Sequence, residues 1–345
     1  MGDNMTRQIK IVRTDHELEC PHLDNALRAT GANLVLLPDD ISEADLMAKT
    51  RDADLILMCY TPITAKVIAG AERLKGIVKF GVGIDAIDID AARAHKIPVV
   101  NIPEYAENTV AEGAFTLMIA LAKKLVPIHN AMQSEGWVWP TERWMGSDIS
   151  GKTVGLVGIG KIGKSMARMV GAGFGASVVG YNPNMSAEAM RAAGAEKYDD
   201  LCDMLAICDF VSVHCVLNEN THHLIGADEL RVMKPTAMLI NVSRGAIIDE
   251  VALVQALKDG TIAGAGLDVY SKEPLNNKDH PMRNLYNMDN VILSPHLTFY
   301  TGEAMQRLED ETFERCMEVL DGRPVTVKSK DPRLTAQESG VIFQT

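Results

Sequence analysis

Three polar side chains in the second half of the chain have types that could perform acid–base chemistry on an anionic ligand. Arg244, Glu273 and His296 each follow a short apolar run. An imidazole titrates near neutral pH, and a guanidinium forms a planar fork that suits carboxylates. Taken singly, each residue has an ordinary structural explanation: a cap or an ion pair for Arg244, a surface turn for Glu273, and packing for His296. Their role therefore depends on the elements that position them.

A glycine-rich turn is the strongest local signal. The run Thr153–Gly163 reads TVGLVGIGKIG, and a helical pattern follows it directly. In a strand–turn–helix unit, Gly158 permits the tight turn, Gly160 lets the backbone approach a pyrophosphate, and Gly163 allows close helix–strand packing. The phosphates would lie at a helix N-terminus, where unpaired N–H groups favour negative charge. The run predicts dinucleotide binding.

The choice between NAD and NADP depends on the end of the next predicted strand, Ser177–Gly180. A dinucleotide fingerprint has an acidic residue about 20 positions after the turn, but Asn182 stands there in this sequence. Asparagine can hydrogen-bond a ribose hydroxyl and carries no charge to repel a 2′-phosphate. However, no basic residue follows before Arg191. NAD is favoured and NADP stays open, and a simple turn at Asn182 is compatible with both.

Short apolar runs alternate with helical patterns along almost the whole chain, which indicates parallel strands covered by helices on both faces. The first series of predicted strands is Ile9–Val12, Asn33–Leu37, Asp54–Met58, Ile77–Phe80 and Pro98–Asn101. The second series is Val154–Gly158, Ser177–Gly180, Phe210–Val213, Ala237–Asn241, Gly264–Asp268 and Val291–Leu293. Two successive series predict an α/β fold with two Rossmann-like or flavodoxin-like, doubly wound parallel sheets.

Two long helices are expected outside these series. The first covers Asn108–Val126, with a capping box at Thr109–Glu112, and is apolar nearly all round, so it must be buried. The second covers Gly302–Leu320. From about Lys328 the sequence is polar and predicts a tail.

Composition excludes several classes of protein. The 345 residues carry a net charge of −12, which repels phosphate backbones and anionic lipid, so we expect no nucleic-acid and no membrane partner. The six cysteines form no C-x-x-C pair, which indicates free thiols in a reducing compartment and no metal site. The N-terminus has no apolar stretch of signal-peptide length, and Gly113–Ala122 is too short to span a bilayer. We expect a soluble, cytoplasmic protein.

Together these motifs resemble the D-isomer specific 2-hydroxyacid dehydrogenases, a family that includes glyoxylate/hydroxypyruvate reductases and phosphoglycerate dehydrogenases. The resemblance covers about Asp54 to Leu320, and its motifs follow the family's order. They are Phe80–Asp88, Thr109–Glu112, the glycine turn, Asn241–Asp249, Asp268–Pro274 and Ser294–His296. The resemblance implies an NAD(P)-dependent oxidoreductase that acts on a CH–OH donor, with its active site in the cleft between two domains.

The resemblance also implies a role for each catalytic residue. His296 would donate a proton to the carbonyl oxygen of a 2-keto acid, and Glu273 would hold its other ring nitrogen. Arg244 would bind the substrate carboxylate and polarise the carbonyl. The implied substrate contacts are Val82, Gly83, Arg244 and His296. The implied cofactor contacts are Gly158, Gly160, Lys161, Ile162, Gly163, Asn182, Cys215, Val242, Ser243, Arg244, Asp268 and His296.

The same resemblance sets the expected domains and assembly. Residues 1–107 with 302–345 are expected to form the substrate-binding (catalytic) domain. Residues 108–301 are expected to form the NAD(P)-binding Rossmann domain, inserted into the first. The helix at Thr109 is implied to help form a homodimer.

Departures from the family narrow the substrate. Met58 stands where phosphoglycerate-oxidising members carry a basic residue, and the single Lys79 holds a phosphate less well than a forked Arg cluster. We therefore expect a small unphosphorylated acid such as glyoxylate or hydroxypyruvate. Glu273 argues against a formate dehydrogenase, which would have glutamine there. Phe299 and Tyr300 are bulkier than the family's usual residues, so they would either crowd the nicotinamide side or reshape a wall of the substrate site. Two alternatives are a 3-phosphoglycerate dehydrogenase and a dinucleotide-sensing, corepressor-type binding protein.

Overall fold

The computed structural model describes residues 7–276 and 278–344 and divides them into two compact units. Unit 1 comprises the residues up to Ala106 and those from Thr301 onward, and unit 2 comprises Glu107–Tyr300. Each division lies one residue before the expected boundary. Among the described residues, no helix is long and apolar enough to cross a membrane.

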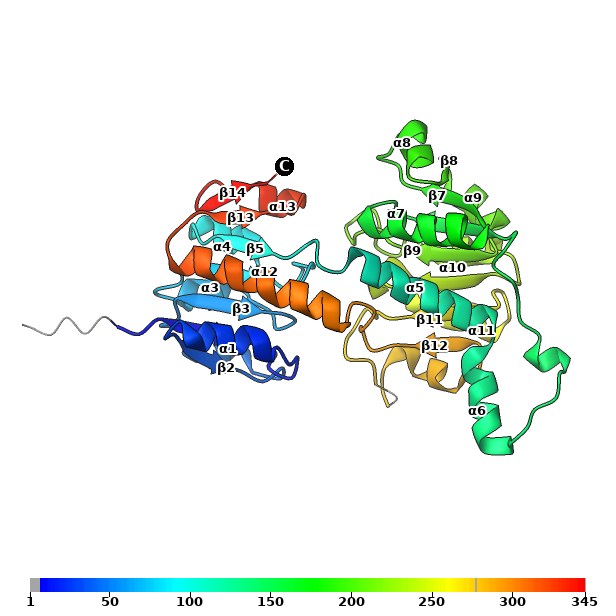
Figure 1. Ribbon diagram of the computed structural model, residues 1–345, viewed down its shortest axis with the longest axis horizontal. Coiled ribbons are helices and arrows are strands. Elements are labelled where there is room, and N and C mark those ends of the chain that lie inside the picture. Colours follow the sequence, from blue (N-terminus) through cyan, green and yellow to red (C-terminus); the bar gives the residue numbers. More distant parts are fainter. Residues whose placement is uncertain (1–6, 277, 345) are drawn as a thin grey trace, which may run out of the picture. The chain divides into compact units, whose positions relative to one another are not determined.

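Unit 1 is built on a parallel five-stranded sheet with the order β2-β1-β3-β4-β5, which is the order of flavodoxin-like folds. Its strands are β1 (Lys10–Arg13), β2 (Asn33–Leu36), β3 (Leu55–Met58), β4 (Gly76–Lys79) and β5 (Val99–Asn101). Its helices are α1 (Pro21–Ala29), α2 (Glu43–Thr50), α3 (Ala65–Gly70), α4 (Ile89–Ala94) and α12 (Gly302–Leu320). Helix α12, drawn in orange in Figure 1, packs against β3 and β4, so the last part of the chain completes the first unit.

Unit 2 is built on a parallel seven-stranded sheet with the order β12-β11-β10-β9-β6-β7-β8. Its strands are β6 (Thr153–Val157), β7 (Ser177–Tyr181), β8 (Glu196–Tyr198), β9 (Phe210–Val213), β10 (Met238–Asn241), β11 (Gly264–Leu267) and β12 (Val291–Leu293). The order reverses between β6 and β9, and a switch point of this kind is where open α/β sheets bind ligands. The prediction of two doubly wound parallel sheets is confirmed.

Helices cover both faces of the unit 2 sheet, because its strands are apolar on both faces. For example, Leu156 and Val157 are adjacent on β6, and they belong to two different clusters of buried apolar residues. The larger helices are α5 (Glu107–Ala122), α6 (Leu125–Glu135), α7 (Lys161–Arg168), α9 (Leu201–Ile207) and α11 (Glu250–Lys258). The shorter segments are α8 (Ala187–Ala192), α10 (Ala227–Val232), η1 (Glu142–Trp144), η2 (Met169–Gly173), η3 (Gly245–Ile247) and η4 (Pro281–Asn287).

The predicted helix over Asn108–Val126 is two helices. Helix α5 ends at Ala122, and Lys124 adopts a left-handed conformation with φ 49° before α6 begins. The predicted capping box is also wrong, since α5 begins at Glu107 and places Thr109 inside the first turn. The expectation of burial holds for the side of α5 that packs on β10 and β11. At Gly266 a Cβ would lie 3.0 Å from the Cβ of Leu117.

The predicted polar tail is wrong as well. Strands β13 (Val325–Val327) and β14 (Val341–Phe343) pair in parallel, and α13 (Pro332–Thr335) connects them. Gln337 anchors this segment to unit 1, because its side-chain amide donates to the Val99 carbonyl at 2.9 Å and accepts from the Val99 amide at 2.7 Å. The sequence after Lys328 is mostly polar and gives little sign of this structure, because its main buried apolar residue is Leu334.

Candidate active site

The glycine turn of unit 2 connects β6 to α7, and each glycine has a separate spatial reason. Gly158 has φ +94°, and a Cβ there would lie 2.6 Å from the Cys215 amide nitrogen. A Cβ at Gly163 would lie 2.4 Å from the Gly158 carbonyl oxygen. At Gly160, by contrast, a Cβ would meet no described atom within 4 Å. Gly160 therefore leaves open space over the backbone, where only an incoming ligand would require the absence of a side chain.

The N-terminus of α7 fits the pyrophosphate of a dinucleotide. Its N-cap, Gly160, has no side chain, so no side-chain cap occupies this end of the helix, where the amides of Lys161 and Ile162 lie in the first turn. The Lys161 Nζ forms an ion pair with Glu107 Oε1 at 2.9 Å. An uncapped helix N-terminus beside an open glycine is the geometry that binds phosphates.

Asn182 follows β7 at the same edge of the sheet. Its Oδ1 accepts a hydrogen bond from the Asn184 amide at 3.2 Å, which is the turn that the sequence left open. The carbonyl of the preceding residue, Tyr181, accepts from the Gly158 amide at 2.9 Å, so Asn182 lies next to the glycine turn. Its role in ribose binding stays a prediction.

His296 and Glu273 form a hydrogen-bonded pair. The His296 Nδ1 lies 2.8 Å from Glu273 Oε2, and the two side chains are 28% and 31% exposed. The other carboxylate oxygen of Glu273 accepts from the Tyr270 amide at 3.0 Å. Burial raises the pKa of Glu273, but the hydrogen bond and charge of His296, the Tyr270 amide and the charge of Arg244 together bring it below its ordinary value. Glu273 is therefore an ionised partner for the imidazole.

Arg244 belongs to the same constellation. It precedes η3, and its Nη1 donates to the Ser243 carbonyl at 2.7 Å. Asn241 holds the loop from β10, since its side chain donates to the Arg244 carbonyl at 2.9 Å. A Cβ at Gly245 would lie 2.0 Å from the Tyr270 carbonyl carbon, so the Arg244 loop and the Glu273 loop touch. Unit 2 thus brings Arg244, Glu273 and His296 together, although their catalytic roles stay predictions.

Asp268 positions His296. Its carboxylate is fully buried and accepts from the Leu297 amide at 2.8 Å, the Thr298 amide at 3.0 Å and the Thr298 hydroxyl at 2.6 Å. His296 itself has φ +59°, an unfavourable conformation for a residue with a Cβ. The hydrogen bonds that Asp268 accepts from Leu297 and Thr298, the two residues after His296, hold that conformation. The sequence predicts a cofactor contact at Asp268, which stays a prediction, but contains no signal of this positioning role.

Glu250 is a second positioning residue that sequence analysis missed. It is the first residue of α11 and is 8% exposed. Its carboxylate accepts from the Ser271 amide at 2.6 Å and from the Ser271 hydroxyl at 2.5 Å. Ser271 lies two residues before Glu273, so Glu250 anchors the loop that carries the partner of His296. An acidic residue in the first turn of a helix has an ordinary explanation from the helix dipole, so its type gave no signal.

The remaining cofactor positions lie on the loops after β9 and β10. The Ser243 hydroxyl donates to the Cys215 carbonyl, which joins these two loops. Cys215 itself is packed over Gly158, as the glycine geometry above requires. Val242 is 8% exposed, so little beyond its backbone is open to a ligand.

The expected substrate contacts of unit 1 lie in the turn after β4. In the described part of the chain, the amides of Val82 and Gly83 donate to no protein acceptor. The Val82 carbonyl accepts from the Asn101 side-chain amide at 2.6 Å, which fixes the turn to the end of β5. Two adjacent, unoccupied amides are a suitable site for a carboxylate.

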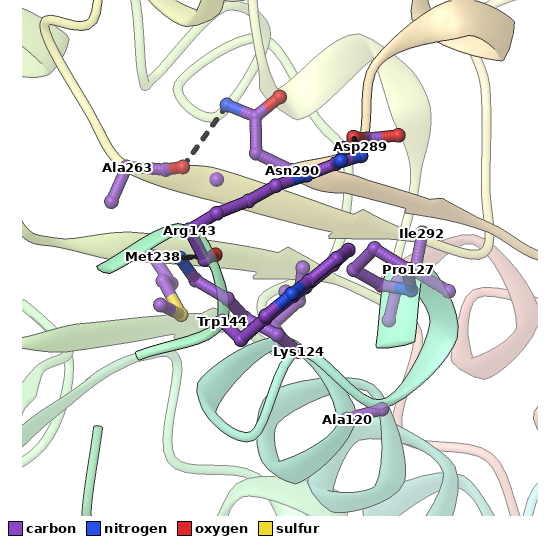
Figure 2. Close-up of a pocket in the computed structure, with 12 residues that line it drawn as sticks. Ala120, Lys124, Pro127, Arg143, Trp144, Met238, Ala263, Asp289, Asn290 and Ile292 are labelled. Carbon is purple, nitrogen blue, oxygen red and sulfur yellow. Dashed lines mark hydrogen bonds and ion pairs between the residues drawn. The ribbon is translucent and has the colours of Figure 1, made fainter. Parts of the chain in front are cut away.

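A pocket of about 120 Å³ lies at the other edge of the unit 2 sheet (Figure 2). Its lining includes Met238 and Gly264 at the amino ends of β10 and β11, with Trp144 and Pro127 from segments outside the sheet. None of the predicted site residues lines it. Since open α/β sheets bind ligands at the carboxyl ends of their strands, this pocket is not the active site.

Comparison with known proteins decides the family. The profile of the D-isomer specific 2-hydroxyacid dehydrogenase, NAD binding domain, matches residues 115–298. This chain belongs to the D-isomer specific 2-hydroxyacid dehydrogenase family. Members of the family are NAD-dependent oxidoreductases that act on a CH–OH donor, and the chain is one of them.

Three relatives illustrate the match. Glyoxylate reductase from Thermococcus litoralis is 36% identical over 293 residues, which cover 83% of this chain and 86% of that protein. D-3-phosphoglycerate dehydrogenase from Methanocaldococcus jannaschii is 38% identical over 303 residues; the match covers 88% of this chain but only 56% of that relative's length. The crystal structure of D-lactate dehydrogenase from Aquifex aeolicus, complexed with NAD and lactic acid, has a TM-score of 0.79 and 27% identity, and the match covers 90% of this chain and 96% of that one.

Proposed function

We propose that this member of the family reduces a small, unphosphorylated 2-keto acid, such as glyoxylate or hydroxypyruvate, to the D-2-hydroxy acid with NADH. The observation that carries the proposal is the ionised Glu273 hydrogen-bonded to His296 at 2.8 Å, with the charge of Arg244 beside them, in the unit that holds the glycine turn. An imidazole, a carboxylate and a guanidinium are the groups that a carbonyl reduction needs.

The proposed mechanism assigns one task to each residue. A bound nicotinamide supplies the hydride. His296 holds a proton on Nε2 for the carbonyl oxygen, because its Nδ1 is occupied by Glu273. Glu273 orients the ring and stabilises its protonated form. Arg244 binds the substrate carboxylate and polarises the carbonyl, and the amides of Val82 and Gly83 take a carboxylate oxygen.

The proposed cofactor contacts follow from the glycine turn. Gly158, Gly160 and Gly163 shape the pyrophosphate site, and the amides of Lys161 and Ile162 bind its oxygens. Asn182 hydrogen-bonds the adenosine ribose, and Cys215, Val242, Ser243 and Asp268 border the nicotinamide side. We propose NAD over NADP because no arginine or lysine follows Asn182 before Arg191.

A phosphorylated substrate is the second candidate. The relative from Methanocaldococcus jannaschii is named a D-3-phosphoglycerate dehydrogenase, which favours that activity. Against it, Met58 is fully buried and apolar at the end of β3. A phosphate carries about two charges and calls for several donors, whereas the ammonium next to the end of β3 belongs to one lysine, Lys79, whose Nζ donates to the Cys59 sulfur at 3.4 Å.

One experiment tests both candidates. Initial rates of NADH and NADPH oxidation are measured side by side with glyoxylate, hydroxypyruvate, pyruvate and phosphohydroxypyruvate. The proposal expects turnover with an unphosphorylated acid and a preference for NADH of at least about tenfold in kcat/KM. A preference for the phosphorylated acid would select the second candidate. Cofactor binding without any turnover would contradict the enzymatic proposal and favour a dinucleotide-sensing, corepressor-type protein.

We also propose that the protein is a homodimer formed through unit 2. The segment from Leu125 to Met145 exposes several large apolar side chains, which soluble monomers rarely cluster. Leu125, Trp137, Trp139 and Met145 are 60%, 69%, 74% and 68% exposed. Figure 1 shows that α6 projects away from the unit 2 sheet, and the pocket of Figure 2 opens beside its base. A projecting apolar segment next to a pocket suits a two-fold interface between copies.

A reducing compartment, the cytoplasm, is proposed on the state of the thiols. All six cysteines are free. Burial raises the pKa of Cys208 to about 12 and that of Cys215 to about 11, which keeps both as unreactive thiols. Titration of the purified native protein with a thiol reagent after extraction under non-reducing conditions is expected to find no disulfide.

A further inference from the structure

Unit 1 buries three cationic side chains in the described part of the chain: Arg13, Lys79 and Arg315. Two of them have carboxylate partners. Arg13 Nε lies 2.9 Å from an oxygen of Asp24, and Arg315 Nε lies 3.1 Å from an oxygen of Glu318. Lys79 is 6% exposed and forms no ion pair with any described residue. A buried ammonium without an opposite charge is costly, and such a group is normally completed by an anion.

The contacts of the Lys79 ammonium are all neutral. Nζ donates to the Phe80 carbonyl at 3.0 Å and to the Cys59 sulfur at 3.4 Å. It also lies 5.5 Å from the centre of the Tyr60 ring. Burial raises the pKa of Cys59, so the thiol is a neutral acceptor and not a counter-ion. The charge of Lys79 is therefore not balanced by any group that it touches.

The ammonium lies directly beside the turn that follows β4. Gly81 has φ +118°, and a Cβ there would be 3.5 Å from Lys79 Nζ. The amides of Gly81, Val82 and Gly83 donate to no protein acceptor in the described part of the chain. Successive free amides form a concave anion site. Because Nζ binds the Phe80 carbonyl, it polarises the peptide group whose N–H belongs to Gly81.

From this juxtaposition we propose that Lys79 is a positioning residue that strengthens the binding of the substrate carboxylate at the Gly81–Gly83 turn. The inference rests on the proposed function, which assigns a carboxylate to that turn. The ammonium acts through the turn: it adds a fixed positive charge behind the amides and makes them better donors. A neutral residue at this position would leave the turn intact but lower the affinity of the turn for an anion.

A competing explanation is that Lys79 only balances Asp15. The Asp15 carboxylate is buried and accepts from the amides of Cys59 at 2.8 Å, Tyr60 at 3.0 Å and Thr61 at 2.9 Å. In that case Lys79 would hold the fold of the β3–β4 loops and nothing more. The loss of its charge would then lower thermal stability and affect every ligand equally.

The test uses Lys79→Met, which keeps the length of the side chain and removes its charge. Binding of oxamate, an unreactive keto-acid analogue, to the enzyme–NADH complex is measured by fluorescence titration, together with KM and kcat for the best keto acid. We expect Kd for oxamate and KM to rise about tenfold, with kcat and the Kd for NADH within about twofold of the wild type. Lys79→Arg restores a charge and is expected to recover most of the affinity.

The matched control is Lys66→Met, which removes a charge from an exposed lysine of the same unit, 73% of whose side chain is accessible. Lys66→Met is expected to change neither the Kd for oxamate nor KM. Unchanged oxamate binding in Lys79→Met would overturn the proposal. So would parallel losses in oxamate affinity, NADH affinity and melting temperature, because those indicate a purely structural lysine. If the wild type reduces no keto acid, the proposed function fails while the oxamate titration still decides the anion site.

Discussion

Glu273 and His296 depend on each other, because the carboxylate is ionised and hydrogen-bonded to one ring nitrogen. In Glu273→Gln the hydrogen bond can persist but the negative charge is lost. The protonated imidazole is then less stable, so we expect kcat for reduction to fall by about 100-fold at pH 7.

The measurement is kcat/KM for reduction between pH 5 and pH 9. Glu219→Gln, which changes an exposed carboxylate of the same unit, serves as the control and should reproduce the wild-type profile. A Glu273→Gln profile that superimposes on the wild type would show that the pair has no part in the proton transfer.

His214 offers a test of stability at the residue scale. It follows β9, and both of its ring nitrogens are buried without a hydrogen-bond partner in the described part of the chain. Burial lowers its pKa from 6.5 to about 4. Because the unfolded chain binds the proton more readily, the folded state loses stability as the pH falls from 6.5 towards 4. The linkage amounts to about 3 kcal/mol.

In His214→Leu this contribution disappears, so the variant's free energy of unfolding should fall less than that of the wild type between pH 7 and pH 4. Urea denaturation at both pH values measures the difference. His222→Gln, at an exposed histidine of the same unit outside the proposed interface, should lose as much stability as the wild type. An identical pH dependence in His214→Leu would mean that the buried ring is protonated in the folded protein.

The three residues proposed to be catalytic could be identified from the sequence, while the residues that only position others could not. Arg244, Glu273 and His296 follow apolar runs, and such positions meet at one edge of a parallel sheet. Asp268 accepts hydrogen bonds from the backbone amides of Leu297 and Thr298. Glu250 accepts one from the backbone amide of Ser271. Any acidic residue can accept a hydrogen bond from a backbone amide. Neither the type of a residue nor its position in the sequence therefore shows which acidic residues do so.

At the scale of elements, the strands were predicted well, because a strand buried on both faces leaves an uninterrupted apolar run. Phe210–Val213 and Val291–Leu293 match the structure to the residue. Strand β8, with the sequence EKY, lies at the edge of its sheet and lacks that signal. The break between α5 and α6 falls at Lys124, three residues before Pro127, and a proline is tolerated in the first turn of a new helix.

A substitution in the glycine turn is expected to weaken cofactor binding without affecting the stability of the fold. A Cβ at Gly160 meets nothing within 4 Å, and the residue has φ −80°, so Gly160→Ala is expected to melt within about 2 °C of the wild type. A bound pyrophosphate would occupy the same space. We therefore expect the affinity of the Gly160→Ala variant for NADH to fall by at least about tenfold, measured by fluorescence titration.

Gly173→Ala is the matched control, because a Cβ there also meets nothing within 4 Å and the residue lies in η2, which extends α7. Both its melting temperature and its NADH affinity should equal those of the wild type. Full NADH affinity in Gly160→Ala would contradict the assignment of the pyrophosphate to this turn.

At the scale of the whole molecule, the exposed segment of unit 2 determines the expected assembly. The rings of Trp137 and Trp139 contact each other edge to face, with centroids 6.2 Å apart, yet both are mostly exposed. Transfer of two indoles into an interface is worth several kcal/mol, and aromatic residues of this kind carry much of the affinity of protein interfaces. A net charge of −12 makes chance association of copies unfavourable, so a dimer requires such specific apolar contacts.

We therefore expect the wild type to sediment as a dimer at micromolar concentration and the double variant Trp137→Ser/Trp139→Ser to shift towards monomer, with Kd raised by about 100-fold or more. Sedimentation velocity over a concentration series measures the shift. Val251→Ser, at an apolar residue of unit 2 that is 71% exposed on α11, controls for a general loss of surface hydrophobicity and should remain dimeric. Because Arg244, Glu273 and His296 all come from one copy of the chain, monomeric variant protein that stays folded should retain NADH binding. A wild type that is monomeric at all concentrations, or a double variant that dimerises normally, would rule out this segment as the interface.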